Sequence, residues 1–381
     1  MIRKRHLIVI DPTAFSGGSK VATENILRLL DTEQTRITVL SADAHSWQLP
    51  QLNRVHLYQP KWLAKQEQGI CYFLLHIYIA FNLLLTRLRF GQFDIGIGAS
   101  GPGVDLALYL LKPLLGIKII QLVHGPVARS RTIARCLIRA DEVYYLESCQ
   151  NSLISTLSCI TNKPQVVMSS HFHIMQNGLP QHAWPTACQT LYPVIFWAAS
   201  LLKWKGLETL LAALEQIEPE MRPETHICYI KPRYTQLPIS QAPTDIEQVR
   251  WYENPVNIDQ LRASSNIFVS TSNHEPFGLS ILEAMAAGLC ILIPSDGAYW
   301  DRTLKNNVNC IKYRAGDAAD LAKKLLVLSR NMKRVTDVGR RAAQIALNYR
   351  AQKQYANITK SIIGLTDYSD IKNVCRGQID D

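Results

Sequence analysis

Several features that would place this protein in a simple class are absent from its sequence. The nine cysteines are scattered singly, without any Cys-x-x-Cys pair, and their odd number argues against a disulfide framework. We therefore expect buried thiols in a reducing cytoplasm. The apolar stretch at residues 7–10 is too short for a secretory signal and ends at Asp11-Pro12, so no export signal is predicted. No segment is of low complexity, which favours a packed globular protein.

Signatures of nucleic-acid binding are equally scarce. The longest basic run is Arg3-Lys4-Arg5, and no RNA-binding aromatic motif occurs, so we expect no nucleic-acid partner. The formal net charge is nevertheless +10. An excess of this size predicts attraction to phosphate groups or to an anionic membrane surface.

One long apolar run stands out at residues 69–85, where only His76 and Asn82 interrupt it. It is slightly shorter than the ~20 residues that cross a bilayer, so we expect a buried core helix. Four basic residues flank the run: Lys61, Lys65, Arg87 and Arg89. They keep shallow contact with a membrane surface open as an alternative.

The most informative stretch of the chain lies at residues 274–285. Glu275 precedes the turn Pro276-Phe277-Gly278, and Glu283 lies on the apolar helix that follows. The first turn of a helix favours an anion, and carboxylates accept hydrogen bonds from hydroxyl groups. The combination suits a ligand that carries both phosphate and hydroxyl groups, such as a nucleotide-sugar. The alternative is a buried helix with two solvated glutamates.

This stretch resembles the donor site of retaining glycosyltransferases of the GT-B fold, glycosyltransferase family 4 (glycosyl transferases group 1). The resemblance implies an α/β protein with two facing Rossmann-like domains and a C-terminal helix that crosses back to the first domain. We place the N-terminal, acceptor-side domain at residues 1–182 and the nucleotide-sugar-binding domain at 193–350. Residues 351–381 would form the crossing helix and a loosely ordered tail. Prolines in residues 180–193 indicate the linker between the domains.

The rest of the chain reads as alternating strands and helices, which predicts parallel sheets covered on both faces. In the first domain, strands are expected at residues 37–40, 55–58, 94–97 and 119–123. A helix at 105–111 is expected to end before Pro113. In the second domain, Asp317 is expected to cap a helix that runs through Leu328.

In the second domain the resemblance implies a donor site without a metal ion. The amides of Phe277, Gly278 and Leu279 would hold the leaving diphosphate together with Lys205. Glu283 would bind the ribose hydroxyls. Glu275 would bind sugar hydroxyls near the reacting carbon, and we rank this role above that of a covalent nucleophile. Ser200 stands where the family has an arginine, and Lys203 is a candidate to take over the role of that arginine.

In the first domain the resemblance assigns roles to Gly17, Gly18 and His124. The Gly17-Gly18 loop follows the first strand and would face the donor diphosphate and the acceptor. An ordinary turn between strand and helix explains it equally well. His124 follows a strand and would hydrogen-bond the donor sugar, although a lone histidine is often structural. Three arginines follow it, as a solvated helix face or as a site for an anionic acceptor: Arg129, Arg131 and Arg135.

The activity implied is a retaining, hexosyltransferase-type transfer from a UDP- or GDP-linked sugar to a glycan or lipid-linked acceptor. We expect a role in cell-surface polysaccharide or lipopolysaccharide synthesis, in the cytoplasm or peripherally on the inner face of the plasma membrane. No cofactor beyond the nucleotide-sugar co-substrate is expected. Two alternatives remain at this stage: a nucleotide-sugar epimerase of the same fold, and a non-catalytic nucleotide-binding subunit, which the serine at Ser200 would suit.

Overall fold

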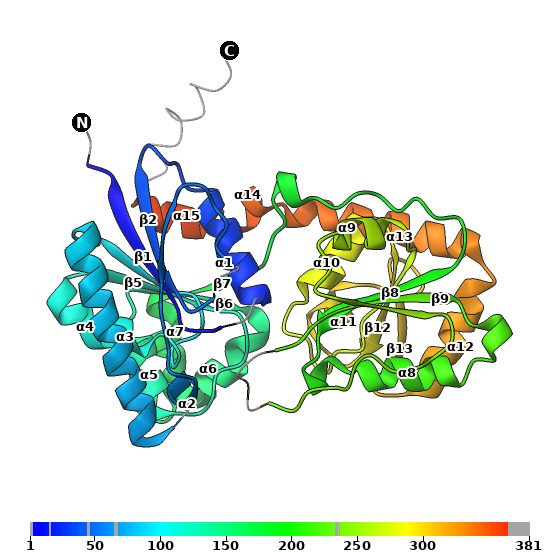
Figure 1. The fold of residues 1–381 in the computed structure, drawn as a ribbon, viewed down its shortest axis with the longest axis horizontal. Coiled ribbons are helices and arrows are strands. Elements are labelled where there is room, and N and C mark those ends of the chain that lie inside the picture. The colour runs from blue at the N-terminus through cyan, green and yellow to red at the C-terminus, as the bar shows by residue number, and fades with distance from the viewer. Residues whose placement is uncertain are drawn as a thin grey trace, which may run out of the picture.

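The protein, represented by a computed structural model, folds into two α/β domains that lie side by side (Figure 1). The structure describes residues 3–14, 17–43, 46–64, 68–232, 235 and 237–364. Residues 368–381 of the expected loosely ordered tail lie outside these ranges, as does Lys65, one of the basic residues that flank the apolar run.

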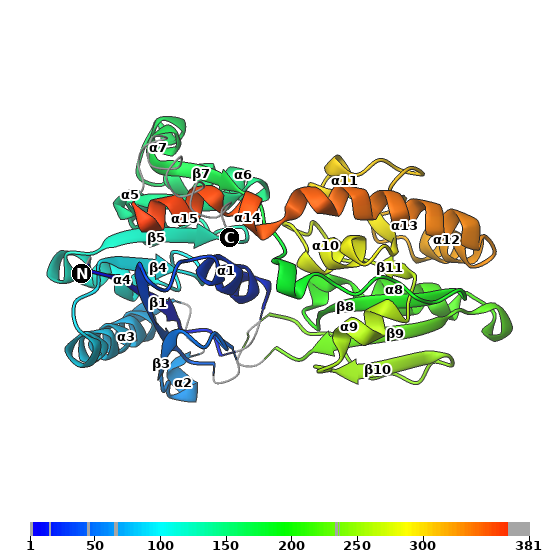
Figure 2. The same ribbon diagram turned by 90° about the horizontal axis from the view of Figure 1, so that it is seen from above.

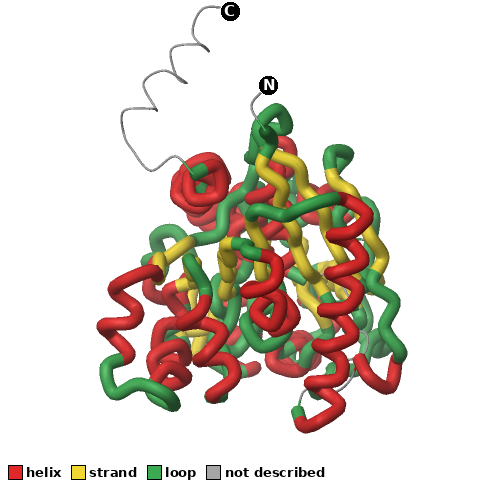
Figure 3. The backbone as a smooth tube through the Cα atoms, turned by 90° about the vertical axis from the view of Figure 1, so that its left-hand side faces the viewer, coloured by secondary structure: helices red, strands yellow, loops and turns green. Residues whose placement is uncertain are grey.

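The first domain is built on a seven-stranded parallel sheet in the order β3-β2-β1-β4-β5-β6-β7. Its strands are β1 (Arg5–Asp11), β2 (Thr35–Ser41), β3 (Leu52–His56), β4 (Ile95–Gly98), β5 (Lys118–Val123), β6 (Glu142–Leu146) and β7 (Phe172–Met175). The central strands are continuous apolar runs because helices bury both of their faces. In Figure 3 helices lie on both sides of these strands.

Helices of the first domain divide between the two faces of that sheet. They are α1 (Gly18–Arg28), α2 (Lys61–Ala64), α3 (Gly69–Phe90), α4 (Leu106–Leu115), α5 (Arg131–Arg139), α6 (Gln150–Leu157) and α7 (Pro164–His171). From β1 to β2 the chain steps toward one edge of the sheet, and from β3 through β4 to β7 it steps toward the other edge. Because the crossovers between parallel strands are right-handed, α1 lies on one face of the sheet and α3 to α7 lie on the other. Helices α3, α4, α5 and α6 contact one another in that order.

The second domain repeats the plan with a six-stranded parallel sheet in the order β10-β9-β8-β11-β12-β13. Its strands are β8 (Val194–Ser200), β9 (Glu224–Ile230), β10 (Val249–Glu253), β11 (Ile267–Val269), β12 (Cys290–Ser295) and β13 (Ile311–Arg314). Its helices are α8 (Leu207–Glu215), α9 (Ile258–Ala263), α10 (Leu279–Ala286), α11 (Tyr299–Thr303), α12 (Ala318–Ser329) and α13 (Met332–Ala346). Asp317 caps α12 as predicted, because its side chain accepts from the amide of Asp320.

Two short helices, α14 (Ala351–Gln354) and α15 (Ala356–Ile363), return the chain to the first domain. Figure 2 shows α13, α14 and α15 running from one domain to the other. The hydroxyl of Tyr144 lies 2.6 Å from Ser361 Oγ, and Arg5 Nη1 donates to the carbonyl of Ile362 at 3.1 Å. The predicted architecture of two Rossmann-like domains with a crossing C-terminal helix is therefore confirmed.

Two local predictions about helices were wrong. Pro113 lies inside α4, which continues to Leu115. It falls in the last turn, where the chain loses a single amide donor and the helix ends soon afterwards at Gly116. The run at residues 69–85 forms α3, but only one face of that helix is buried. Its other face exposes large apolar side chains, among them Ile70 and Phe81.

Candidate functional site

The 274–285 stretch forms a tight turn that leads into α10. Gly278 caps the helix with a φ of 77°, which is the left-handed conformation that glycine adopts without strain. A Cβ at this position would lie 2.9 Å from Glu275 Cγ, so glycine also leaves room for the glutamate. Phe277 is 2% exposed and packs against Tyr299 and Trp300 at centroid distances of 5.0 and 5.2 Å. The buried ring anchors the turn, while the amides at the start of α10 remain free of side-chain caps.

Lys205 and Glu275 form an ion pair at this turn. Lys205 Nζ donates to Glu275 Oε2 at 2.6 Å, and the side chains are 18% and 14% exposed. The lysine ends a short turn whose next residue, Gly206, has a φ of 70°. Thr271 donates from Oγ1 to the carbonyl of Lys205 at 2.9 Å. The backbone that carries the lysine is thereby fixed against the loop that follows β11.

Glu283 is paired in a second, separate interaction. Arg262, at the end of α9, donates from Nη2 to Glu283 Oε2 at 2.6 Å and from Nη1 to Asp259 at 2.9 Å. The arginine side chain is 6% exposed. Burial raises the pKa of Glu283, and the positive charge of Arg262 opposes that shift. The alternative of two solvated glutamates is therefore wrong for this chain, because each carboxylate forms an ion pair and is only partly exposed.

The loop after β12 closes the other side of the turn. The buried carboxylate of Asp296 accepts from the amide of His274 at 2.8 Å and from the amide of Ala298 at 2.9 Å. His274 has a φ of 50°, which is unusual for a residue other than glycine. A small cavity is lined by Glu275, Ser272 and Asp296 together with residues of α10, β12 and α11. Asp296 thus belongs to the scaffold that orients the motif.

The first domain meets this turn through its glycine loop. A Cβ added to Gly18 would lie 3.8 Å from Leu279 Cδ1, so the start of α1 lies against the start of α10. α1 follows β1, and α10 follows β11. Both sheets therefore present the carboxyl ends of their strands to the boundary between the domains, where ligands of such sheets bind. Gly17 and Gly18 lie at this boundary together with Phe277, Gly278 and Leu279.

His124 lies directly after β5, at the same edge of the first sheet. Both ring nitrogens are shielded from solvent, and neither has a hydrogen-bond partner within the described part of the chain. Burial lowers the pKa of His124 to about 4, so the ring is neutral at physiological pH. A buried imidazole without a partner is costly unless another group supplies one. Each nitrogen lacks a hydrogen-bond partner among the described residues, and protein atoms cover both of them.

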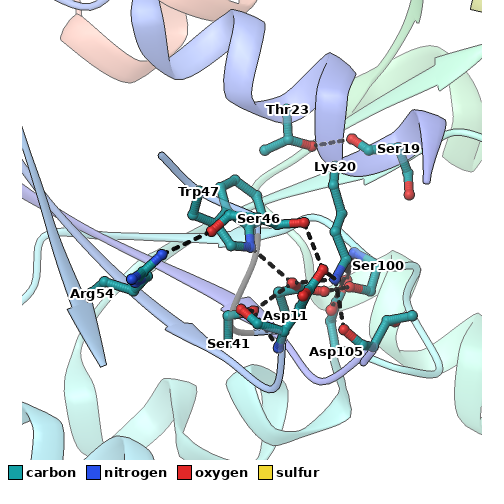
Figure 4. A network of polar contacts seen from close by, with 12 residues as sticks. Asp11, Ser19, Lys20, Thr23, Ser41, Ser46, Trp47, Arg54, Ser100 and Asp105 are labelled. Atoms are coloured by element: carbon teal, nitrogen blue, oxygen red, sulfur yellow. Dashed lines mark hydrogen bonds and ion pairs between the residues drawn. The ribbon is translucent and has the colours of Figure 1, made fainter. Parts of the chain in front are cut away.

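A buried polar network, drawn in Figure 4, connects the start of α1, next to the glycine loop, with the ends of neighbouring strands. Lys20 Nζ lies 2.9 Å from Asp11 Oδ2 and 3.1 Å from Asp43 Oδ2, and it donates to the carbonyl of Thr13 at 2.6 Å. Trp47 Nε1 donates to Asp11 Oδ2 at 2.8 Å. These contacts fix the first turn of α1 against the ends of β1 and β2. One signal of this network is visible in the sequence, because Asp11 directly follows the apolar run at residues 7–10.

Asp105 extends this network at the start of α4. Its Oδ2 accepts from the amide of Gly101 at 2.9 Å and from Gln121 Nε2 at 2.9 Å. Complete burial raises the pKa of Asp105 to about 8, with a smaller contribution from nearby Asp11. A protonated Asp105 accepts these hydrogen bonds without placing another negative charge beside Asp11.

The other basic residues that the sequence suggested as ligand contacts do not join the ion pairs of Glu275 and Glu283. Lys203 is exposed, whereas Lys205 contacts Glu275. Arg129, Arg131 and Arg135 are exposed, on α5 and the loop before it. Sequence reasoning missed Arg262, because nothing in the short helix α9 indicates that its side chain reaches Glu283 on a different helix. Among the described residues, no cluster of His, Cys, Asp or Glu side chains could hold a metal ion.

The second domain resembles a known protein family in sequence. Residues 184–345 match the family "Glycosyl transferases group 1". This range contains Lys205, Arg262, Glu275 and Glu283, so both paired carboxylates lie within the matched residues. The match spans most of the second domain and does not extend into the first. No curated protein matches the chain in sequence.

Solved structures match nearly the whole chain in fold. Sucrose-phosphate synthase from Thermosynechococcus elongatus superposes with a TM-score of 0.71 at 14% identity, covering 95% of this chain and 99% of that one. Anabaena HepE, in complex with UDP and glucose, gives 0.68 at 14% identity, covering 93% and 98%. WaaG, a glycosyltransferase involved in lipopolysaccharide biosynthesis, gives 0.64 at 11% identity, covering 93% and 99%. The chain thus has the GT-B fold.

Proposed function

We propose that this protein is a retaining glycosyltransferase that moves a hexosyl group from a nucleotide-diphosphate-sugar to a hydroxyl group of its acceptor. In this reaction the bond from the anomeric carbon to the diphosphate oxygen breaks, and a bond from that carbon to the acceptor oxygen forms. The acceptor hydroxyl loses a proton to the departing phosphate. The observation that carries the proposal is the Lys205–Glu275 ion pair beside the uncapped start of α10, within a glycosyl transferases group 1 domain.

The second domain would bind the donor. The amides of Phe277, Gly278 and Leu279 and the ammonium of Lys205 would stabilise the charge that develops on the leaving diphosphate, without a metal ion. Glu275 would accept hydrogen bonds from sugar hydroxyls, with its orientation set by Lys205. Glu283 would accept from the ribose hydroxyls with its free oxygen, while Arg262 holds the other oxygen.

The first domain would complete the site from the opposite side. His124 is neutral and has both nitrogens without a protein partner among the described residues. It would donate one hydrogen bond to a sugar and accept another once substrate binding uncovers the ring. Gly17 and Gly18 would let the backbone at the start of α1 come close to a diphosphate, because glycine has no side chain. The network of Lys20, Asp11 and Asp43 would hold this loop rigid when substrates exchange.

For the substrates we favour a UDP- or GDP-linked donor and a glycan or lipid-linked acceptor. The presence of UDP and glucose in the Anabaena HepE structure supports the nucleotide. The role of WaaG in lipopolysaccharide biosynthesis supports cell-surface glycan assembly. We place this activity on the cytoplasmic side of the plasma membrane. The positive net charge of +10 suits an anionic donor and a phosphorylated acceptor.

Calorimetric titration of UDP, GDP and ADP tests the donor site, with Glu283→Gln as the matched variant. We expect one nucleotide to bind the wild type and to bind the variant at least about tenfold more weakly, the effect of one lost charged hydrogen bond. Transfer is then tested with the sugars linked to that nucleotide, and NMR of the product reports the anomeric configuration. An inverted product would refute retention, and equal binding by both proteins would refute the ribose contact.

A non-catalytic nucleotide-binding subunit is the second candidate, because Ser200 occupies the place of the family's arginine. Arginine offers two parallel hydrogen bonds to a phosphate, which neither serine nor lysine reproduces. This candidate predicts nucleotide binding without transfer or hydrolysis of any donor. Replacement of Ser200 by arginine would then be expected to raise turnover, whereas it should leave an already competent enzyme little changed.

A further inference from the structure

Helix α3 presents an apolar face to solvent along its whole length. Seven large side chains at intervals of one, three or four residues are exposed on it: Ile70, Phe73, Leu74, Ile77, Phe81, Leu85 and Leu88. With 3.6 residues per turn, these positions fall on one side of the helix. Leu75, Ile79 and Leu83 lie on the opposite side and are buried in the core of the first domain. An ordinary surface helix has polar residues where α3 has this apolar face.

The apolar face continues onto α4. Tyr72 donates to the carbonyl of Gly103 at 2.6 Å, and Arg87 Nη1 donates to the carbonyl of Leu114 at 3.1 Å, so the two helices run side by side. Leu114 is 63% exposed, and Leu110 of the same helix is also exposed. Exposed apolar surface of this extent on a protein marks an interaction site.

The charged residues of the helices on this side of the first domain all have one sign. Helices α3, α4 and α5 contain no aspartate or glutamate, and they carry six basic residues: Arg87, Arg89, Lys112, Arg131, Arg135 and Arg139. Lys112 is paired with Asp141 at 2.6 Å. Arg89 and the three arginines of α5 are exposed. A partner for this surface must therefore combine apolar material with negative charge.

We propose that α3 and α4 dock the protein on an anionic lipid bilayer, with α3 lying in the plane of the surface. Apolar side chains on one face of a helix and basic residues beside it are the features of interfacial membrane helices. A second copy of the chain is a poorer partner, because pairing through this face would bring two sets of arginines together.

Helix α3 also has the length and apolar composition of a membrane span, the one such helix in the described part of the chain. Spanning would require it to leave the core that buries Leu75, Ile79 and Leu83. Docking in the plane keeps those contacts and buries the exposed face as well.

The position of α3 relates this surface to the ligand edge of the first sheet. The chain runs from α3 into the amino end of β4, so the start of α3 lies toward the carboxyl ends of the strands. The same edge carries His124 and the start of α5 with Arg131. Docking through α3 would therefore bring that edge close to lipid headgroups. This inference rests on α3 and its neighbours and does not depend on the proposed transferase activity.

Co-sedimentation of the full chain with lipid vesicles tests the proposal. We expect binding to phosphatidylcholine vesicles that contain about one-third phosphatidylglycerol, at least about tenfold stronger than to phosphatidylcholine alone and weakened by salt. The variant Phe73→Ser, Ile77→Ser, Phe81→Ser removes the centre of the apolar face. It should lose binding to both kinds of vesicle while keeping the circular dichroism spectrum of the wild type.

A matched control replaces three exposed apolar residues outside the first domain: Leu191→Ser, Val256→Ser, Leu347→Ser. It should bind vesicles as the wild type does. Failure of the wild type to bind anionic vesicles, or equal binding by the α3 variant, would overturn the proposal. Sedimentation velocity supplies a further check, since a wild-type dimer that the α3 variant loses would assign the face to self-association instead.

Discussion

Lys205 Nζ lies 2.6 Å from Glu275 Oε2, and the two side chains are 18% and 14% exposed. The residues are far apart in the sequence, on the turn after β8 and on the loop before α10. Their pairing joins a proposed phosphate contact to a proposed sugar contact in one unit. A donor that inserts its diphosphate near Lys205 would share the ammonium with Glu275, so the two roles should fail together.

We expect Lys205→Ala and Glu275→Ala each to lower kcat/KM for transfer by on the order of 100-fold, because each removes a charged group from the reacting centre. The double variant should lose little more than either single variant, since the residues act as a pair. Steady-state kinetics on the three proteins measure this directly.

The control for these variants is Asp337→Ala, which breaks the exposed Arg340–Asp337 pair at 3.2 Å. It should change stability by less than ~1 kcal/mol and leave transfer unchanged. Wild-type turnover in Glu275→Ala or in Lys205→Ala would exclude these residues from the site.

Glu283 is expected to serve both stability and nucleotide binding. Glu283→Ala removes the carboxylate that pairs with Arg262, whose side chain is 6% exposed, and should destabilise the fold by about 3 kcal/mol. Glu283→Gln keeps an acceptor for the guanidinium and should cost less. Urea denaturation compares the two variants. Equal stability of Glu283→Ala and the wild type would mean that Asp259 alone satisfies Arg262.

His124 should remain neutral across the physiological range. Burial lowers its pKa to about 4 from the ordinary value of 6.5. As pH falls, the unfolded chain therefore binds a proton at His124 before the folded chain does. The free energy of unfolding decreases through this group as pH falls from 6.5 toward 4. NMR chemical shifts of the ring carbons, recorded against pH for the folded and for the urea-unfolded protein, measure the two pKa values of His124. A folded-state midpoint close to that of the unfolded chain would contradict the burial of this side chain.

Gly206 should be irreplaceable for steric reasons. Its φ is 70°, and a Cβ would lie 2.1 Å from the carbonyl oxygen of Thr271. Gly316 has a φ of 72° with nothing near a Cβ, so Gly316→Ala measures backbone strain alone, about 1–2 kcal/mol. Gly206→Ala should cost clearly more and should also displace Lys205. Thermal unfolding of both variants gives the comparison. Similar losses of stability would show that the loop at Thr271 moves to make room for the added Cβ.

Asp105 should make stability fall as pH rises. The folded protein holds this proton up to about pH 8, whereas the unfolded chain releases it near 3.8. Between these values each unit of pH lowers the free energy of unfolding by at most about 1.4 kcal/mol through this group. The slope should be absent in Asp105→Asn, which stays neutral. Urea denaturation at several pH values tests this, and identical slopes for both proteins would show that Asp105 is ionised in the fold.

Much of the architecture follows from local patterns in the sequence. Continuous apolar runs predicted the buried parallel strands, and Asp317 marked the start of a helix through hydrogen bonds that its own side chain makes. The Glu275–Gly278 turn was predictable because Pro276 and Gly278 restrict the backbone at their own positions. These features depend on residues that are close in sequence.

Contacts between distant elements were decided only by the tertiary structure. Nothing in α9 or α10 alone indicates that Arg262 reaches Glu283, and nothing in β1 or α1 alone indicates that Lys20 reaches Asp11. Hydropathy identified α3 as an apolar helix but could not tell which side would be covered, because periodicity vanishes when both faces are apolar. Packing against the first sheet buried Leu75 and Ile79 and left Ile77 and Phe81 facing solvent.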